Sequence, residues 1–494
     1  MIKPKSNIFY AFLICLLWQS NFYAQDLTES LYGTYNDYKE KSLDKRRIKH
    51  HQLQPLINNL KTDSRYTVKK VGESIEGRDL RLISIGEGPV NVFLWSQMHG
   101  DEPTATQAIF DIFNFLNGDA FKAEKKAILS KLTLHFLPML NPDGAEVFTR
   151  RNALGIDINR DALRLQSPEG QVLKRIRDSV NADFGFNLHD QSRYYNAERT
   201  NKPATISYLA TAYNYEKDIN DVRANAMKVI VYMNNIIQKY APGQVGRYGD
   251  DFEPRAFGDN IAKWGTSLIL IESGGYGGDR EKQEIRKLNY VSILSALYTI
   301  ANESYKDISV EAYEEIPRND RKMFDLKIEN ATYILNEKEY TIDLGIYRNE
   351  IDDAYHNNFY YRSSIIDQGD LSTFYGYETF DATGYTIVPP KIASAEVQPS
   401  GKEFFVLNAK DLLKTGNAYV RATSIPKELT FSKSPINLVS KNYRLSDFRL
   451  QPGVNPTFFL AKNDKITHAV INGFLIDLSK SMESQNTGNG IIIK

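Results

Sequence analysis

The chain has 494 residues, of which 42% are hydrophobic and 25% are charged, and these values exclude a mainly disordered or fibrous protein. Its 61 Lys and Arg residues balance 61 Asp and Glu residues, so net charge gives no support for a nucleic-acid binder. This length favours two or three domains.

The N-terminal residues 1–24 have the pattern of a signal peptide. Basic residues precede the apolar run Ile8–Trp18, which is shorter than the roughly 20 residues of a membrane span. We expect cleavage after Ala24, export to the periplasm or the extracellular space of a bacterial envelope, and no remaining membrane span; a retained anchor is the alternative. Cys15 is the only cysteine, so the mature chain would contain no disulfides.

Residues 25–305 read as one domain in which strands and helices alternate. After a polar, helical stretch at 27–61, short apolar runs at 92–95, 132–137, 184–188 and 268–271 predict buried strands. Apolar residues at helical spacing predict helices over 103–116, 169–180, 220–240 and 281–300. This alternation predicts an α/β fold with a mostly parallel mixed sheet flanked by helices.

Residues 306–320 are acidic and polar, and we expect them to form a linker. The long helical patterns largely stop beyond this point, and short runs rich in Tyr, Phe, Thr and Ile alternate with turn signals. Residues 321–494 are therefore predicted to form a β-rich accessory domain, with a sandwich as the expected architecture.

Ionisable side chains follow three of the predicted strands. His99 and Glu102 lie between the predicted strand 92–95 and the helix that follows it. His189 follows the predicted strand 184–188, and Glu272 follows the predicted strand 268–271. Each alone has a structural explanation, such as a solvated turn, but parallel strands bring all of them to one edge of a sheet. Two His and one Glu form the ligand set of a catalytic zinc site, although the ligand types leave iron or manganese open.

The segment 149–161 is dense in Arg and Asn and lies between the two ligand segments. A guanidinium can bind a carboxylate through two hydrogen bonds, and a neighbouring amide can add a third. The segment is therefore a candidate carboxylate-binding loop, with a solvated turn as the alternative.

Four segments in this order resemble the zinc carboxypeptidases of the M14 family, the carboxypeptidase A and B type. They are Gly72–Arg78, His99–Glu102, Asn141–Gly144 with Arg150–Arg160, and Ile271–Gly275. The resemblance covers approximately residues 30–300 and leaves the C-terminal third of the chain unexplained.

The resemblance implies one Zn²⁺ per chain and a role for each matching residue. His99, Glu102 and His189 would bind the metal, with Asp157 orienting a ligand histidine. Glu272 would be the general base that takes a proton from zinc-activated water.

On the substrate side, the resemblance implies that Arg150 polarises the scissile carbonyl and that Asn159 and Arg160 bind the terminal carboxylate. Arg150 is preferred over Arg151 because of the Arg-x-Asn spacing. Tyr248 is a candidate for a tyrosine that caps the substrate.

This chain also departs from the family pattern. Asp190 follows the third ligand, where familiar members usually have Ser. The floor of the side-chain pocket is unassigned, with Phe257 and Asp259 as candidates that would favour apolar and basic terminal residues respectively.

The predicted function is that of an exported zinc metallocarboxypeptidase acting on peptides with a free C-terminal carboxylate. One alternative is an N-acyl amino acid deacylase of the aspartoacylase or succinylglutamate desuccinylase type. Another is an inactive surface binding protein. The sequence does not indicate an oligomeric state or a natural substrate.

Overall fold

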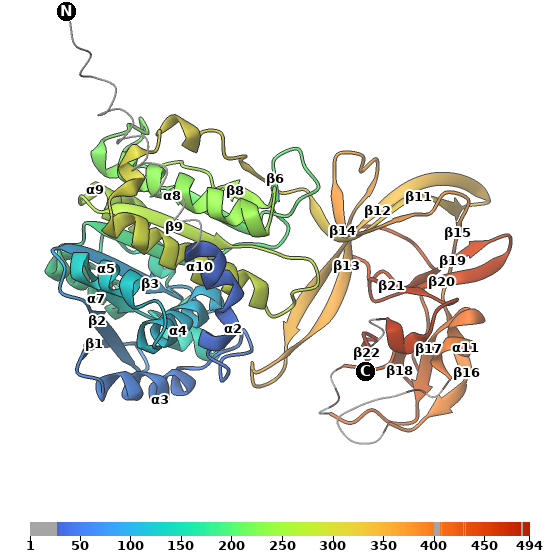
Figure 1. Ribbon diagram of the computed structural model, residues 1–494. Helices are drawn as coiled ribbons and strands as arrows, with labels where there is room; N and C mark the ends of the chain where they lie inside the picture. Colours follow the sequence, from blue (N-terminus) through green and yellow to red (C-terminus); the bar gives the residue numbers. More distant parts are fainter. Residues whose placement is uncertain (1–26, 400–405, 407, 428, 430, 486–487) are drawn as a thin grey trace, which may run out of the picture. The chain divides into compact units, whose positions relative to one another are not determined.

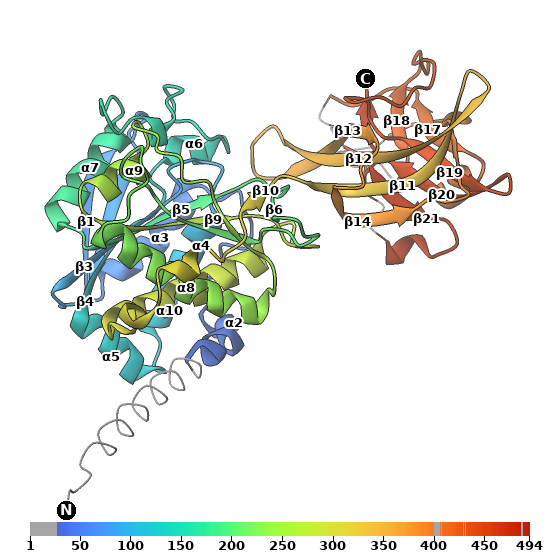
Figure 2. The ribbon, with the colours of Figure 1, turned by 90° about the horizontal axis from the view of Figure 1, so that it is seen from above.

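The protein is described here from a computed structural model over residues 27–399, 406, 408–427, 429, 431–485 and 488–494. The predicted signal peptide lies outside these residues. The chain forms two compact units, of which the first ends at Arg321 and the second begins at Lys322 (Figures 1 and 2).

The first unit is built on an eight-stranded sheet with the order β1-β2-β4-β3-β5-β9-β7-β8. The central strands β4, β3, β5 and β9 are parallel, whereas β2 and β7 join them antiparallel. The predicted mixed sheet is therefore confirmed. The strands are β1 (Tyr66–Glu73), β2 (Asp79–Ile85), β3 (Val90–Ser96), β4 (Leu132–Leu137), β5 (Phe184–Asp190), β7 (Ile206–Ala210), β8 (Val245–Arg247) and β9 (Ser267–Ser273).

Helices flank this sheet, and the four long predicted helices correspond to α4, α7, α8 and α10. The N-terminal starts of α7 and α8 are fixed by capping residues, because the side chains of Ser167 and Asn220 each accept a hydrogen bond from a backbone N–H in the first turn of the helix that follows. The helices are α2 (Tyr35–Tyr38), α3 (His50–Lys61), α4 (Thr104–Asn117), α5 (Lys122–Lys131), α6 (Pro142–Glu146), α7 (Pro168–Val180), α8 (Asp221–Tyr240), α9 (Phe257–Lys263) and α10 (Gln283–Ala301). No helix of the described residues is long and apolar enough to cross a bilayer.

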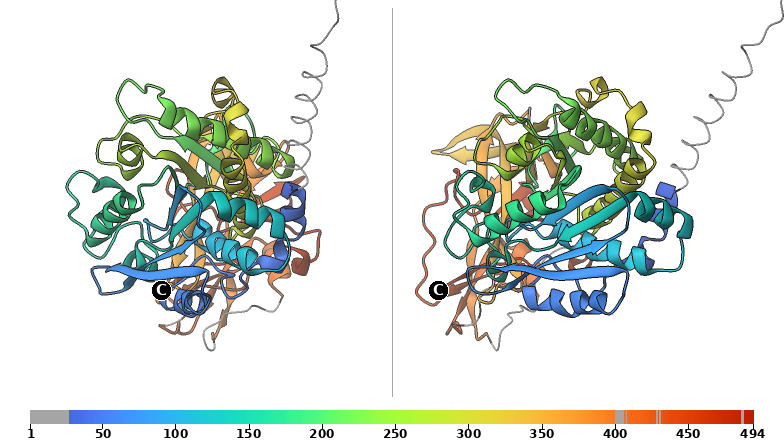
Figure 3. Two further views of the ribbon diagram at one scale, coloured as in Figure 1. Left: turned by 60° about the vertical axis from the view of Figure 1, so that its left-hand side comes forward. Right: turned by 90° about the vertical axis from the view of Figure 1, so that its left-hand side faces the viewer.

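The sheet separates two apolar cores, and helices cover both of its faces (Figure 3). One core joins it to α3, α4, α8 and α10, and the other joins it to α7 and α9. The near-continuous burial of β3, β5 and β9 follows from this double cover. Such burial leaves the carboxyl ends of the strands as the place where polar side chains can gather.

The segment 306–320, expected to be a linker, is packed into the first unit. It contains η3 (Glu311–Tyr313) and the whole of β10 (Asn319–Asp320), which pairs with β6 (Asn196–Ala197). The Tyr313 side chain is fully buried and its hydroxyl accepts a hydrogen bond from Ala210 N at 3.0 Å. The polar composition of this segment does not indicate that it packs through a buried side chain, Tyr313.

The second unit is β-rich, as predicted, and contains two sheets. An eight-stranded sheet comprises β11 (Met323–Leu335), β12 (Lys338–Asp352), β13 (Phe359–Gly369), β14 (Tyr375–Asp381), β15 (Thr386–Val388), β19 (Phe458–Lys462), β20 (Lys465–Ile471) and β21 (Phe474–Asp477). A four-stranded sheet comprises β16 (Lys391–Val397), β17 (Asn417–Ala422), β18 (Asn437–Ser440) and β22 (Ile492–Ile493). Its strand pairs are all parallel, and the two sheets share an apolar core that also includes Leu413 of α11 (Ala409–Lys414).

Candidate active site

The loop after β3 is bent sharply and fastened to α4. Gln97 has a left-handed φ of 52°. Its side chain donates to Gly100 O at 2.9 Å and accepts from the Thr106 hydroxyl at 3.0 Å. These bonds hold the loop against the helix, so that His99 and Glu102 are presented at the carboxyl edge of the sheet.

The Asn-Pro-Asp-Gly segment packs directly on this loop. A side-chain carbon at Gly100 would lie 2.1 Å from the carbonyl carbon of Gly144, so only glycine permits the approach of the two backbones. Asn141 caps α6 by accepting from Gly144 N at 2.9 Å, and its amide donates to Arg150 O at 3.2 Å. The segment therefore places Arg150 beside the His99 loop.

The Gly72–Arg78 segment contacts α6, the helix that Asn141 caps. Arg78 forms an ion pair of 2.6 Å with Asp143, which also accepts a hydrogen bond of 2.7 Å from the Ser74 hydroxyl. Its contribution is structural, because it fixes α6 and through α6 the Arg150 loop.

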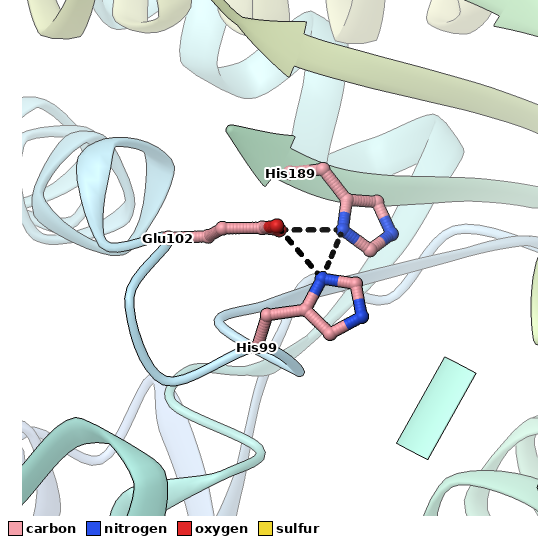
Figure 4. Close-up of side chains that lie close together, drawn as sticks. All are labelled: His99, Glu102 and His189. Atoms are coloured by element: carbon pink, nitrogen blue, oxygen red, sulfur yellow. Dashed lines mark hydrogen bonds and ion pairs between the residues drawn. The ribbon is translucent and has the colours of Figure 1, made fainter. Parts of the chain in front are cut away.

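His99, Glu102 and His189 converge as the sequence predicts (Figure 4). Glu102 lies 2.8 Å from His99 Nδ1 through one oxygen and 2.7 Å from His189 Nδ1 through the other. The two Nδ1 atoms are 3.2 Å apart, and all three residues are buried.

The electrostatics of this cluster suit a bound cation. Burial alone would lower the pKa of His99, but the Glu102 and Asp157 carboxylates raise it to about 9. Burial would raise the pKa of Glu102, yet the two imidazoles hold it well below its ordinary value. The two imidazoles and the ionised carboxylate of Glu102 thus direct one ligand atom each toward one point. Two His and one Glu form the ligand set of a catalytic zinc site. The residues fit the metal that the resemblance implies.

Asp157 and Arg150 form the outer layer of the cluster. Asp157 lies 3.2 Å from His99 Nε2 and accepts from Arg150 Nε at 3.0 Å. Arg150 also reaches Glu102 at 3.3 Å. Burial would raise the pKa of Asp157, but His99 and Arg150 lower it strongly, so the carboxylate can orient the imidazole.

Glu272 stands opposite His189 in the register of β5 and β9. Its Oε2 atom is buried and has no hydrogen-bond partner among the described residues. Burial, followed by the charge of Glu102, raises its pKa well above the ordinary carboxyl value. A carboxyl group perturbed in this way beside a metal site is the kind of group that carries protons in catalysis.

The cluster opens into a cavity of ≈ 340 Å³. Asn159, Arg160 and Tyr248 all line it together with the metal-site residues. Asn159 Oδ1 accepts from Phe257 N at 3.0 Å, so its NH₂ group is the part that could bind a carboxylate. The guanidinium of Arg160 lies 3.8 Å from Glu253, and the ring of Tyr248 packs edge-on against Tyr195.

The remaining candidates occupy different positions. Phe257 is fully buried in the core between the sheet and α9 and does not line the cavity. Asp259 lines the cavity, and burial raises its pKa to about 6. Asp190 also lines the cavity and accepts from the Thr104 hydroxyl at 2.6 Å and from Lys282 at 3.0 Å.

Comparison with known proteins agrees with this geometry. Residues 55–162 match the family model Peptidase_M14, described as zinc carboxypeptidase. Residues 55–162 therefore carry the similarity to an M14 zinc carboxypeptidase domain. The match includes His99 and Glu102 and the whole Arg and Asn loop.

The relatives of similar sequence include carboxypeptidases. The chain is 33% identical over 176 residues to carboxypeptidase SOL1 of Arabidopsis thaliana, covering 29% of this chain and 35% of that protein. It is 30% identical over 122 residues to carboxypeptidase E of Caenorhabditis elegans, covering 20% of this chain and 26% of that protein. The chain thus spans about a third or less of the length of these two relatives.

Solved structures similar to this chain include two metallocarboxypeptidases. That of Burkholderia cenocepacia is 16% identical with a TM-score of 0.41, covering 52% of this chain and 69% of that chain. Carboxypeptidase A of Helicoverpa armigera is 15% identical with a TM-score of 0.42, covering 57% of this chain and 80% of that chain.

Two buried groups beside the metal cluster carry no signal in the sequence. Lys282 lies far along the chain from Asp190, and nothing local marks it as a partner. Gln191 donates to Ser207 at 2.8 Å and accepts from Asn319 at 2.7 Å. These contacts join segments up to 128 residues apart, so only the fold brings them together.

Proposed function

We propose that this protein is a zinc-dependent carboxypeptidase that hydrolyses the C-terminal bond of peptides. The observation that carries the proposal is one cavity lined by the His99, Glu102 and His189 cluster, by Glu272, and by the Arg and Asn loop. A metal hydrolase needs the first two features, and selection of a chain end needs the third.

His99, Glu102 and His189 would hold the zinc ion, and Asp157 would fix the ring of His99 through Nε2. Zinc supplies a Lewis acid that polarises a carbonyl and lowers the pKa of water. Glu272 takes a proton from the attacking water and returns it to the leaving amine. Burial raises the pKa of Glu272, which favours uptake of the proton from water, because the neutral carboxyl is the product of that transfer.

Arg150 serves the developing oxyanion. Its guanidinium is already oriented by Asp157 and lies next to Glu102. A donor fixed before the reaction stabilises charge without further reorganisation. Asn159 and Arg160 bind the terminal carboxylate, and Tyr248 covers the bound residue. The resemblance assigns these roles, and the shared cavity supports them.

We also infer that the protein is exported, with residues 1–24 removed. The support is the basic start, the short apolar run and the small residue Ala24 before the expected cleavage site. Determining the N-terminus of the protein recovered from cell fractions tests this inference. A mature chain beginning at Gln25 in the periplasmic or extracellular fraction is expected, and an uncleaved cytoplasmic chain would contradict it.

The activity is tested by following a peptide and an N-acyl amino acid side by side with the purified zinc-loaded protein. We expect release of the terminal amino acid from the peptide, and a loss of rate of about 10²–10⁴-fold in Glu272→Gln. Glu216→Gln, on an exposed glutamate, is the control. Turnover of the N-acyl amino acid alone would support a deacylase, and equal rates in both variants would refute the assignment of Glu272.

A further inference from the structure

The segment 317–320 contacts both of the chain segments whose tyrosines line the cavity. Its strand β10 pairs with β6, which follows Tyr195 directly (Figure 2). On the other side, Arg247 N donates to Pro317 O at 2.7 Å, immediately before Tyr248. The rings of Tyr195 and Tyr248 meet edge-on, with their centroids 6.0 Å apart. One short segment therefore joins the backbones that carry both rings.

The Asn319 side chain closes a ring of three hydrogen bonds. The Ser207 hydroxyl donates to Asn319 Oδ1 at 2.8 Å, and the amide of Asn319 donates to Gln191 Oε1 at 2.7 Å. The amide of Gln191 completes the ring by donating to Ser207 Oγ at 2.8 Å. Gln191 and Ser207 are buried, so loss of Asn319 would leave polar groups of both without a partner.

Two glycines make room for this ring. A side-chain carbon at Gly246 would lie 1.9 Å from Asn319 Oδ1, and one at Gly274 would lie 2.9 Å from Gln191 Nε2. Gly246 belongs to β8 and stands two residues before Tyr248. The Asn319 side chain therefore packs directly against the backbone of the strand that leads to Tyr248.

The ring lies next to the metal cluster in the sheet. Ser207 stands opposite Glu272 in the register of β7 and β9, and Gln191 follows His189 by two residues. Gln191 lines the cavity, whereas Asn319 does not. Asn319 can therefore influence a bound substrate only through other residues.

We propose that Asn319 is a positioning residue that holds the ring of Tyr248 against Tyr195 at the wall of the cavity. This inference rests on the proposed carboxypeptidase function, in which Tyr248 covers the bound residue. Without the Asn319 side chain the ring of hydrogen bonds opens, and the two tyrosine segments lose the side-chain link between them. The metal ligands and Glu272 are not members of the ring, so the loss should weaken binding of the peptide more than it slows the chemical step.

The test combines Asn319→Ala with Tyr248→Ala in the zinc-loaded protein and measures kcat and KM for one peptide. We expect Asn319→Ala to raise KM by about fivefold or more and to change kcat by less than about twofold, as a loss of uniform binding does. In the Tyr248→Ala background, the same substitution should raise KM by less than about twofold, because residues that act through one contact are not additive. Asn235→Ala, at an exposed position of α8, is the control and should change neither constant.

A merely structural role of Asn319 predicts a different pattern. A smaller folded fraction would lower the apparent kcat and the zinc content by the same factor in both backgrounds and leave KM unchanged. An unchanged KM in Asn319→Ala, or an equal rise of KM with and without the Tyr248 ring, overturns the inference while leaving the carboxypeptidase function intact. Release of no terminal residue by the wild-type protein from a mixed set of peptides would overturn both.

Discussion

Lys282 lies 3.0 Å from Asp190 Oδ2 and donates to Ser273 O at 2.8 Å. Asp190 follows the third metal ligand on β5, and Ser273 follows Glu272 on β9. One ammonium therefore joins the two strands immediately beyond His189 and Glu272. This relationship accounts for Asp190, which departs from the usual family residue.

Replacing Lys282 with Met should destabilise the protein and misplace Glu272. Asp190 and Lys282 are both largely buried, with 7% and 12% of their side chains exposed. Removing one partner of a buried pair typically costs about 3–5 kcal/mol, because the other charge is left uncompensated. Urea denaturation should show this loss, and Asp190→Asn combined with Lys282→Met should recover part of it. Equal stability of all three proteins would show that the pair is unimportant.

Arg150 and Arg151 provide a matched pair of substitutions. Arg150 contacts Glu102 and Asp157, whereas Arg151 is exposed and its side chain donates to Gly155 O. Arg150→Ala should lower kcat by about 10²-fold or more, because a preorganised donor to the oxyanion is lost. Arg151→Ala should leave kcat near the wild-type value. Zinc content must be measured in both, and a kcat loss in Arg151→Ala alone would reverse the assignment.

The raised pKa of Asp259 predicts a dependence of specificity on pH. Burial raises this pKa to about 6, so the carboxyl is mostly neutral at pH 5 and mostly ionised at pH 7. An ionised Asp259 attracts a terminal Lys but not a terminal Gln. The ratio of kcat/KM for Lys over Gln should therefore rise between pH 5 and 7, and Asp259→Asn should flatten the rise. A ratio that falls with pH would contradict the placement of Asp259.

Arg286 and Asp111 form a buried ion pair that does not line the cavity. We expect this pair to make a large contribution to the stability of the fold. Both side chains are fully buried and paired, and Arg286 also donates to Glu40 O at 2.9 Å. Arg286→Met leaves a buried carboxylate unpaired, at an expected cost of about 3–5 kcal/mol. Chemical denaturation measures this cost. Since the pair does not line the cavity, the KM of the remaining folded protein should not change; an altered KM would show coupling to the site.

The sequence was sufficient for the features that are local or repeated along the chain. Helical periodicity located α4, α7, α8 and α10 to within about two residues, and the strand ends predicted the metal cluster because parallel strands share an edge. The family resemblance supplied the roles of Asp157 and Arg150, and the structure brings both to His99 and Glu102.

The remaining features depend on contacts between distant segments. The polar segment 306–320 packs through Tyr313, which composition alone could not separate from a linker. The parallel pairing of β16, β17, β18 and β22 is not encoded by alternation of apolar residues. Asn187 was visible only as part of an apolar strand, and the burial of its amide without a hydrogen-bond partner is apparent only in the folded structure.

The proposed zinc site should act only on a peptide with a free C-terminal carboxylate, and comparing a peptide acid with its amide tests this requirement. The zinc-loaded protein is incubated with the same peptide as a free acid and as a C-terminal amide, and the products are followed by mass spectrometry with and without a chelator. We predict stepwise loss of terminal residues from the acid alone, abolished by the chelator and restored by Zn²⁺. Equal trimming of the amide, internal cleavage, or trimming that survives the chelator would contradict the account.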